Sequence, residues 1–446
     1  MKGGFESEPL RKAGARVAII CCSIALFLTL DFGYSAFINN EASPRVAVKE
    51  YDHGLVANFD GYARFGEYRY RFYTNSLGFR DNAVRQVPRQ FGSRRVILIG
   101  DSFVEGMAVT FDESFAGQLA QAGAKAAVPI EFLNAAVVSY SPIIYYRKIK
   151  YLIDSGLRFD EVIVFSDPSD VQDEATTYFC LDDDPQYLQY CRDFAPSKSP
   201  NLPAQSPVSE EANWSSWFQE HFVVTDSTRM LIKYGIQLVL DNRSHKSADD
   251  NPRAGWTIAG YPLGDSFAPL GLEGGIARSK KNMQALADLL RERGIPLTIV
   301  VYPWPLHLAL EDRNSRQVAI WRDFCRTNCK AFVDLFPAFF RERDTHDDWY
   351  KRLFIYGDLH LSVAGNKFMF REVAKQLGLD YYIPINWDRN VYKPRGPVRA
   401  RESPETEPFK HRPCDPGIEG PLSGISSLSS PHNGMGSGTH LIEHGP

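Results

Sequence analysis

Between residues 94 and 377, short apolar runs alternate with longer segments whose apolar residues recur at helical spacing. The apolar runs predict buried strands, at residues 96–99, 130–133, 162–165, 297–302 and 331–335. The segments with helical spacing predict helices, at residues 110–122, 143–153, 279–293, 315–326 and 363–377. Strands that are apolar throughout are typical of sheets covered on both faces. The pattern therefore predicts an α/β fold, a three-layer α/β/α sandwich with a mostly parallel sheet.

A longer apolar stretch lies near the N-terminus. Residues 17–38 contain one charged side chain, Asp31, and are long enough to cross a bilayer as a helix. Basic residues precede this stretch, namely Lys2, Arg11, Lys12 and Arg16. The positive-inside rule then predicts a cytoplasmic tail at 1–16 and a transmembrane signal anchor at 17–38. We expect a single-pass protein of the cell inner membrane with its domain on the periplasmic side. A cleaved signal peptide is the alternative.

The remaining chain divides by composition. Residues 39–93 are rich in aromatic residues and Gly, and we expect an N-terminal segment packed on the core. The main domain is expected at 94–392, with an insertion at 171–275 that includes a Pro/Ser-rich part at 195–215 and a helix near 217–240. Residues 393–446 have little periodicity and are predicted to be disordered.

Composition and cysteine placement narrow the class of protein. The chain has 446 residues, of which 44% are hydrophobic and 23% charged, as in globular proteins. A net charge of −4 excludes the basic excess typical of nucleic-acid binders. Two close cysteine pairs in an exported domain suggest local disulfides, Cys180 with Cys191 and Cys325 with Cys329. Reduced thiols and metal binding remain the alternatives for these pairs.

Two short strings contain the residues of a nucleophilic site. In the first, Gly100-Asp101-Ser102 follows a predicted strand, at the edge of the sheet where α/β proteins bind ligands. In the second, Asp358-Leu359-His360 stands just before the last predicted helix. A Ser hydroxyl needs a base to become a nucleophile, and a carboxylate can orient that base. We therefore predict Ser102 as nucleophile, His360 as base and Asp358 as the orienting residue.

These strings resemble the SGNH (GDSL-like) hydrolase superfamily. Its first block is G-D-S, and its last block is D-x-x-H or, in a branch acting on polysaccharide acetylation, D-x-H, the spacing found here. LNAAVVSYSP (133–142) is similar to the second block, with Ser139 in place of the oxyanion Gly. FSDPSD (165–170) is similar to the third, with Ser169 where Asn is expected. The resemblance implies an oxyanion hole made of the N–H groups of Ser102 and Ser139 and the Ser169 hydroxyl.

The resemblance also implies a function, namely that of a membrane-anchored serine esterase or acyltransferase. Its substrates would be acyl esters, chiefly O-acetyl groups of a carbohydrate. It implies no metal or organic cofactor, and a membrane partner that donates acyl groups. The rival interpretation is a non-catalytic carbohydrate-binding or polysaccharide-assembly factor on a degenerate scaffold, suggested by the altered second and third blocks. Arg80, in TNSLGFRD, is expected either to reach an acidic or sugar substrate or to form a salt bridge with Asp81 or the core.

Overall fold

The strands of the main domain join one eight-stranded sheet. The structure is a computed structural model that describes residues 7–38, 43–66, 68–181, 222, 224–225, 228–229 and 252–378. The strand order is β10-β9-β8-β6-β7-β5-β4-β3. The first five run parallel, namely β10 (Ala331–Asp334), β9 (Leu297–Val301), β8 (Glu161–Ser166), β6 (Arg94–Ile99) and β7 (Ile130–Asn134). Every residue of β8 and β9 is buried, because both faces of the parallel part are covered.

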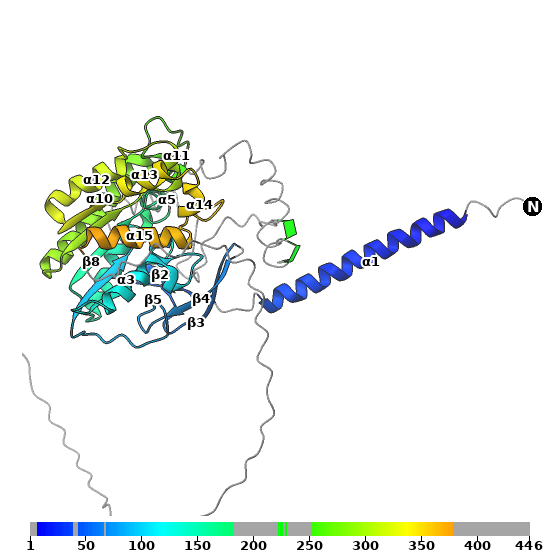
Figure 1. Cartoon of the computed structure of the whole chain (residues 1–446), viewed down its shortest axis with the longest axis horizontal. Coiled ribbons are helices and arrows are strands. Elements are labelled where there is room, and N and C mark those ends of the chain that lie inside the picture. Colours follow the sequence, from blue (N-terminus) through cyan, green and yellow to red (C-terminus); the bar gives the residue numbers. More distant parts are fainter. Residues whose placement is uncertain are drawn as a thin grey trace, which may run out of the picture. The chain divides into compact units, whose positions relative to one another are not determined.

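Helices pack in two groups around this sheet. One group is α3 (Phe115–Ala124) with α15 (Val363–Gln376), which lie side by side (Figure 1). The other is α4 (Pro142–Asp154), α5 (Asp170–Thr176) and α12 (Arg316–Asn328) around the long helix α10 (Gly271–Glu292). Shorter helices complete the domain: α2 (Ser102–Glu105), α9 (Pro252–Gly255), α11 (Pro305–Ala309), α13 (Phe336–Thr345), α14 (Trp349–Leu353) and the 3₁₀ turns η1 (Phe111–Glu113) and η2 (Phe179–Leu181). The predicted α/β class with a mostly parallel sheet is confirmed.

The predicted helix at 110–122 is interrupted. Its first turn is the 3₁₀ turn η1, and α3 begins only after Ser114, whose Oγ accepts a hydrogen bond from Gly117 N at 3.0 Å. A Cβ at Gly117 would come within 1.8 Å of Phe111 O, so the tight junction between the two pieces requires Gly. Within the described residues of the main domain, the other predicted strands and helices between 94 and 377 are present with small shifts of their ends. The exception is α10, which begins eight residues earlier, at Gly271 rather than Ser279.

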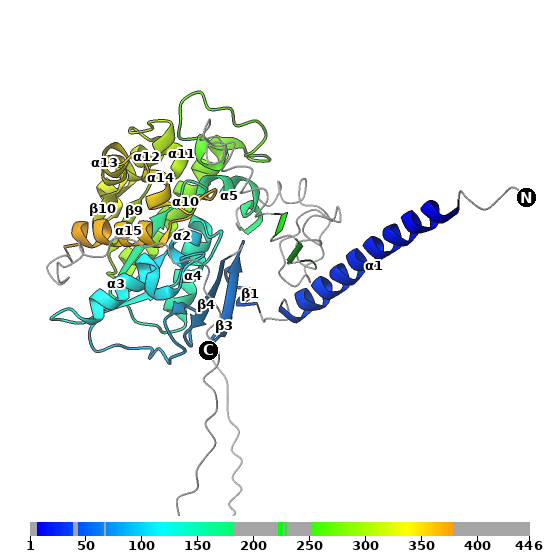
Figure 2. The same ribbon diagram turned by 45° about the vertical axis from the view of Figure 1, so that its right-hand side comes forward.

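Residues 39–93 contribute more to the domain than a segment packed on its core. β5 (Arg80–Asp81), β4 (Tyr68–Thr74) and β3 (Asp60–Phe65) extend the main sheet in antiparallel fashion to its edge (Figure 2). In β4 buried residues alternate with partly exposed ones from Tyr70 to Thr74, the pattern of a strand with one covered face. The hairpin of β1 (Arg45–Val48) and β2 (Asp52–Leu55) forms a sheet of its own.

The apolar N-terminal stretch is one helix, α1 (Ser7–Ile38). Its section Gly14–Ser35 is long and apolar enough to cross a membrane, and large side chains such as Ile19 are more than half exposed there. By length and composition this helix could serve as a signal sequence or as an anchor.

Cys325 and Cys329 are joined by a disulfide, and Cys180 is disulfide-bonded as well. Several predictions fall outside the described residues. These are Cys191, the Pro/Ser-rich part 195–215, most of the helix near 217–240, and the tail 393–446.

Candidate active site

Ser102 stands at the carboxyl end of the central strand β6. The chain turns sharply there, and a Cβ on Gly100 would lie 2.5 Å from Val104 Cγ2 and 3.0 Å from Phe165 O. Asp101 caps the short helix α2, because its Oδ1 accepts a hydrogen bond from Phe103 N at 3.0 Å. Ser102 is 6% exposed, so the turn holds its hydroxyl just below the surface.

Asp358 and His360 lie on the loop between α14 and α15. A bridge between Phe354 and Leu361 closes the base of this loop. On the adjoining helix α15, Asn366 Oδ1 accepts a hydrogen bond from Phe115 N at 3.0 Å, which ties the start of α15 to the start of α3. This contact joins residues 251 positions apart and brings the histidine loop to the end of β6.

The three predicted triad residues are hydrogen-bonded in a row. His360 Nε2 lies 2.9 Å from Ser102 Oγ, and His360 Nδ1 lies 2.6 Å from Asp358 Oδ1. Asp358 Oδ1 also accepts a hydrogen bond from the backbone N–H of His360 at 2.8 Å. The imidazole is held between two aromatic rings, with Phe103 stacked on it at 5.1 Å and Phe65 edge-on at 4.8 Å.

The electrostatics of Asp358 fix the tautomer of the histidine. Burial raises the pKa of Asp358, but the hydrogen bonds that it accepts from His360 more than offset this, so its pKa lies below the ordinary value. An ionised Asp358 only accepts hydrogen bonds, so Nδ1 of His360 must carry a proton. Nε2 of the neutral ring is then free to accept the proton of the Ser102 hydroxyl.

Ser139 follows β7, the neighbour of β6, and is therefore placed at the same edge of the sheet. Its φ of 63° lies in the left-handed region that favours Gly. Its carbonyl accepts a hydrogen bond from Tyr178 Oη at 2.8 Å. The residue before it, Val138, donates its N–H to Glu105 Oε2 at 2.7 Å, which connects this loop to the helix that begins with Ser102.

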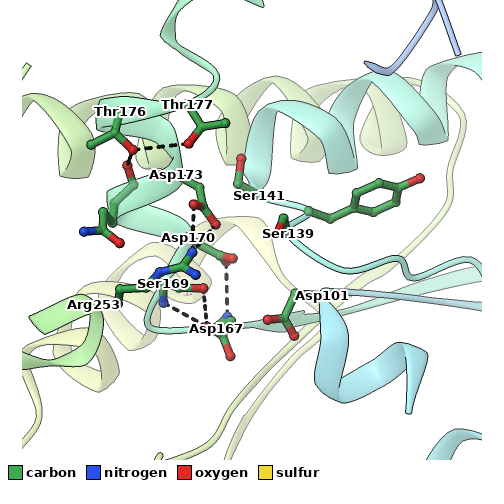
Figure 3. Close-up of polar contacts among 12 residues, drawn as sticks. Asp101, Ser139, Ser141, Asp167, Ser169, Asp170, Asp173, Thr176, Thr177 and Arg253 are labelled. Atoms are coloured by element: carbon green, nitrogen blue, oxygen red, sulfur yellow. Dashed lines mark hydrogen bonds and ion pairs between the residues drawn. The ribbon is translucent and has the colours of Figure 1, made fainter. Parts of the chain in front are cut away.

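The Ser169 hydroxyl is engaged elsewhere. It donates to Asp167 Oδ1 at 2.6 Å, and Ser169 N donates to the same oxygen at 2.8 Å (Figure 3). Asp167 Oδ2 accepts further hydrogen bonds from Tyr302 and Trp304, at 2.8 and 2.9 Å. The Ser169 hydroxyl, which was expected to donate a hydrogen bond to an oxyanion, therefore donates to the buried carboxyl group of Asp167.

Asp101 adds a second buried carboxyl group next to the nucleophile. Its Oδ2 lies 3.2 Å from Ser102 Oγ, and its Oδ1 lies 3.3 Å from Tyr302 Oη, which also contacts Asp167. Burial, with the charge of Asp167 close by, raises the pKa of Asp101 well above its ordinary value. The Ser102 hydroxyl thus has two acceptors in reach, Asp101 and His360, but only one proton to donate.

Two residues near the site have roles that the sequence pattern does not show. Arg80, expected at a substrate or in a salt bridge with Asp81 or the core, is fully buried in the core. It donates to the carbonyl oxygens of Glu105, Gly106 and Val109 at the end of α2, and reaches neither a substrate nor Asp81. Glu105 is also fully buried. Burial raises its pKa, but the Arg45 guanidinium more than offsets this and lowers it below the ordinary value. Single-sequence reasoning offers no signal for either role, since both depend on partners far along the chain.

Other acidic side chains near this edge have partners of their own. Asp173 receives two hydrogen bonds from Arg253 Nη2, each 2.7 Å long (Figure 3). Glu174 accepts hydrogen bonds from Ser141 and Ile143 at the start of α4. Within the described part of the chain, no group of His, Cys, Asp and Glu side chains is arranged to hold a metal ion.

Comparisons with known proteins find distant structural likeness. No protein-family model matches the chain, and no curated protein matches it. The structure titled TesA is 8% identical over 64% of this chain and 99% of that one, with a TM-score of 0.35. A psychrotrophic esterase EstA from Pseudoalteromonas sp. is 10% identical over 64% and 99%, with a TM-score of 0.31. A lipase/acylhydrolase from Enterococcus faecalis is 12% identical over 64% and 95%, with a TM-score of 0.30. A functional assignment therefore has to come from this chain's own residues.

Proposed function

We propose that this protein is a serine esterase or acyltransferase that cleaves acyl esters through Ser102, His360 and Asp358. The observation that supports this most directly is the row of hydrogen bonds from Ser102 Oγ through the His360 ring to Asp358, at 2.9 and 2.6 Å. A neutral histidine oriented by an ionised carboxylate is the arrangement that activates a Ser hydroxyl.

In the first half of the reaction, Ser102 Oγ attacks the acyl carbonyl carbon while its proton moves to His360 Nε2. The imidazolium is stabilised by Asp358. When the tetrahedral intermediate collapses, the bond to the leaving alcohol breaks and His360 returns the proton to the alcohol oxygen. An acyl group then remains on Ser102.

In the second half, a water molecule or a second alcohol attacks the carbonyl carbon of this acyl group and gives its proton to His360 Nε2. The ester bond to Ser102 Oγ then breaks, and His360 returns the proton to Oγ. Water as acceptor makes the protein an esterase, and a sugar hydroxyl makes it a transferase.

The developing oxyanion needs hydrogen-bond donors near the reacting carbonyl. We assign this role to the backbone N–H groups of Ser102 and Ser139. Ser169 contributes at most indirectly, since its hydroxyl donates to Asp167. Each oxyanion donor is worth about 10² to 10³ in rate, so a hole of two backbone donors is compatible with measurable but slow turnover.

The proposed substrate and location rest on features of the sequence. The resemblance of Asp358-Leu359-His360 to the D-x-H block favours O-acetyl esters of a carbohydrate. The basic residues that precede the apolar stretch 17–38 favour an anchor with the domain outside the inner membrane. A membrane partner that supplies acyl groups would fit a transferase held at the membrane in this way.

The test uses the full chain in detergent, beside its Ser102→Ala variant. A fluorophosphonate probe should label the wild-type protein, and the variant should lose the label. With p-nitrophenyl acetate, steady Ser102-dependent turnover in water indicates an esterase. A burst that stalls and resumes on addition of an oligosaccharide indicates a transferase. Folded protein that is neither labelled nor active would contradict the proposal.

A non-catalytic carbohydrate-binding or assembly factor is the second candidate. The buried carboxyl group of Asp101 favours it, because the Ser102 hydroxyl can donate its one proton to Asp101 instead of to His360. Unlabelled protein that binds an acetylated oligosaccharide in calorimetry would support this second function.

A further inference from the structure

The peptide bond between Val138 and Ser139 supplies the N–H assigned above to the oxyanion. The orientation of this peptide gives Ser139 a φ of 63°, which is unfavourable for a residue other than Gly. A flip of this one peptide bond would turn φ of Ser139 to a negative, relaxed value. The same flip would point the N–H in the opposite direction. Something must therefore hold the peptide in the strained orientation.

His53 holds the other end of this peptide group. Its Nε2 lies 2.8 Å from Val138 O, and a carbonyl oxygen can only accept, so Nε2 is the donor. The C=O and N–H of a trans peptide point in opposite directions, so fixing the carbonyl on His53 also fixes the direction of the Ser139 N–H. A hydrogen bond to the carbonyl also polarises the peptide and makes its N–H a better donor.

The imidazole of His53 is itself held in place. Its Nδ1 lies 2.7 Å from Asp52 Oδ1. Its ring meets Tyr140 edge-on at 4.9 Å and stacks on Tyr178 at 6.5 Å. Tyr140 Oη donates to the backbone carbonyl of His53 at 2.6 Å. Three of these contacts hold the side chain of His53, which is 19% exposed, and the fourth holds its backbone.

The peptide groups on either side are held as well. Val138 N donates to Glu105 Oε2, and Ser139 O accepts from Tyr178, at 2.7 and 2.8 Å. These bonds fix the neighbouring peptide groups but leave the Val138–Ser139 peptide free to rotate. The bond from His53 is the contact, among the described residues, that acts on the carbonyl of this peptide.

We propose that His53, on the separate β1–β2 hairpin, is a positioning residue that holds the Val138–Ser139 peptide with its N–H toward the oxyanion. This inference rests on the proposed function, because the N–H has a task only if Ser102 forms an acyl intermediate. It assigns a role in the reaction to a hairpin that lies outside the eight-stranded sheet.

The experiment compares full-length wild type, His53→Ala, His53→Gln and His53→Ala combined with Ser139→Gly. We expect His53→Ala to lower kcat about 10- to 100-fold, less than the complete loss of one oxyanion donor because the N–H is misdirected and not removed, with little change in KM. His53→Gln keeps a side-chain N–H and should recover part of the loss. Gly relieves the strain that drives the flip, so the double variant should be more active than His53→Ala alone.

A crystal structure of His53→Ala provides a readout that does not depend on activity. It should show the Val138–Ser139 peptide flipped and φ of Ser139 negative. A loss of activity without a flip and without rescue by Gly would overturn the inference in favour of a merely structural role. Unchanged kcat in His53→Ala, beside an active wild type, would overturn the inference and leave the proposed function intact. An inactive, unlabelled wild type would overturn the proposed function and this inference together.

Discussion

Arg45 and Glu105 form a two-point ion pair, with Nη1 2.6 Å from Oε2 and Nη2 2.5 Å from Oε1. Arg45 comes from the hairpin that follows α1, and Glu105 is the last residue of the helix that begins with Ser102. Because Glu105 also accepts the N–H of Val138, one buried carboxylate connects helix α2, the loop that contains Val138 and Ser139, and the β1–β2 hairpin.

The first prediction concerns this ion pair. Arg45→Met leaves the Glu105 carboxylate buried without its counter-ion, which should lower the free energy of unfolding by about 3 kcal/mol. Urea denaturation at pH 7 measures the change. Arg326→Met is the matched control, since Arg326 and its partner Asp323 are both mostly exposed and their pair should contribute little. Equal losses in the two variants would show that Glu105 does not need Arg45.

The second prediction concerns the orientation of His360. In Asp358→Asn the amide cannot hold the ring in the tautomer that leaves Nε2 free, so Ser102-dependent turnover should fall about 10³- to 10⁴-fold. Turnover of p-nitrophenyl acetate by the full chain measures the loss. Asp347→Asn, an exposed acid on the α13–α14 connection, should retain wild-type activity. An active Asp358→Asn enzyme would assign the orientation of His360 to another residue.

The third prediction concerns Lys148, whose amine is fully buried. Its Nζ donates to Ala135 O and Tyr140 Oη, at 2.7 and 3.0 Å, and burial lowers its pKa from 10.5 to about 7. Between these pH values the unfolded chain binds more protons than the folded one, so the free energy of unfolding should rise with pH. The slope attributable to Lys148 is at most about 1.4 kcal/mol per pH unit.

Urea denaturation at pH 7, 8 and 9 tests this slope. Lys148→Met should flatten the curve relative to wild type. Lys150→Met is the control on the same helix, because Lys150 is half exposed and pairs with Asp154. If the curves of wild type and Lys148→Met run parallel, the amine titrates in the same way in the folded and unfolded chains.

The fourth prediction concerns Asp101. Burial and the charge of Asp167 raise its pKa, so its contribution to stability is fully present below the unfolded pKa of 3.8 and is lost as the pH rises through the folded value. Asp101→Asn keeps an oxygen that can accept the Phe103 N–H and removes the charge. This variant should gain more stability over wild type at pH 8 than at pH 5. A uniform loss at both pH values would mean that the ionised carboxylate itself is needed.

The parallel part of the sheet could be predicted from the sequence because its strands are covered on both faces. In β6, β8 and β9 this burial requires runs of apolar residues, and such runs can be recognised in the sequence without knowing which strands pair with them. Ser102, Asp358 and His360 could be proposed because each lies in a short string with its own chemical pattern.

The membership of β3, β4 and β5 in the same sheet could not be predicted, since it depends on pairings between distant backbones. Arg80, for example, pairs with Asn134 across 54 positions of the chain. The engagement of Ser169 by Asp167 and the left-handed φ of Ser139 depend on side-chain reach and on neighbouring loops. A charged residue such as Glu105 gives no sign in the sequence that it will be fully buried.

The distance along the chain between Ser102 and His360 governs when the protein could become reactive. The two residues are 258 positions apart, and the histidine loop is fixed by α15, the last helix of the described chain. During synthesis, Ser102 therefore emerges long before His360. With these residues in their proposed roles, a partly synthesised chain carries an unactivated hydroxyl, and any product truncated before residue 360 is inert however well its first half folds. In those roles, synthesis as far as α15 is itself the step that activates the Ser102 hydroxyl.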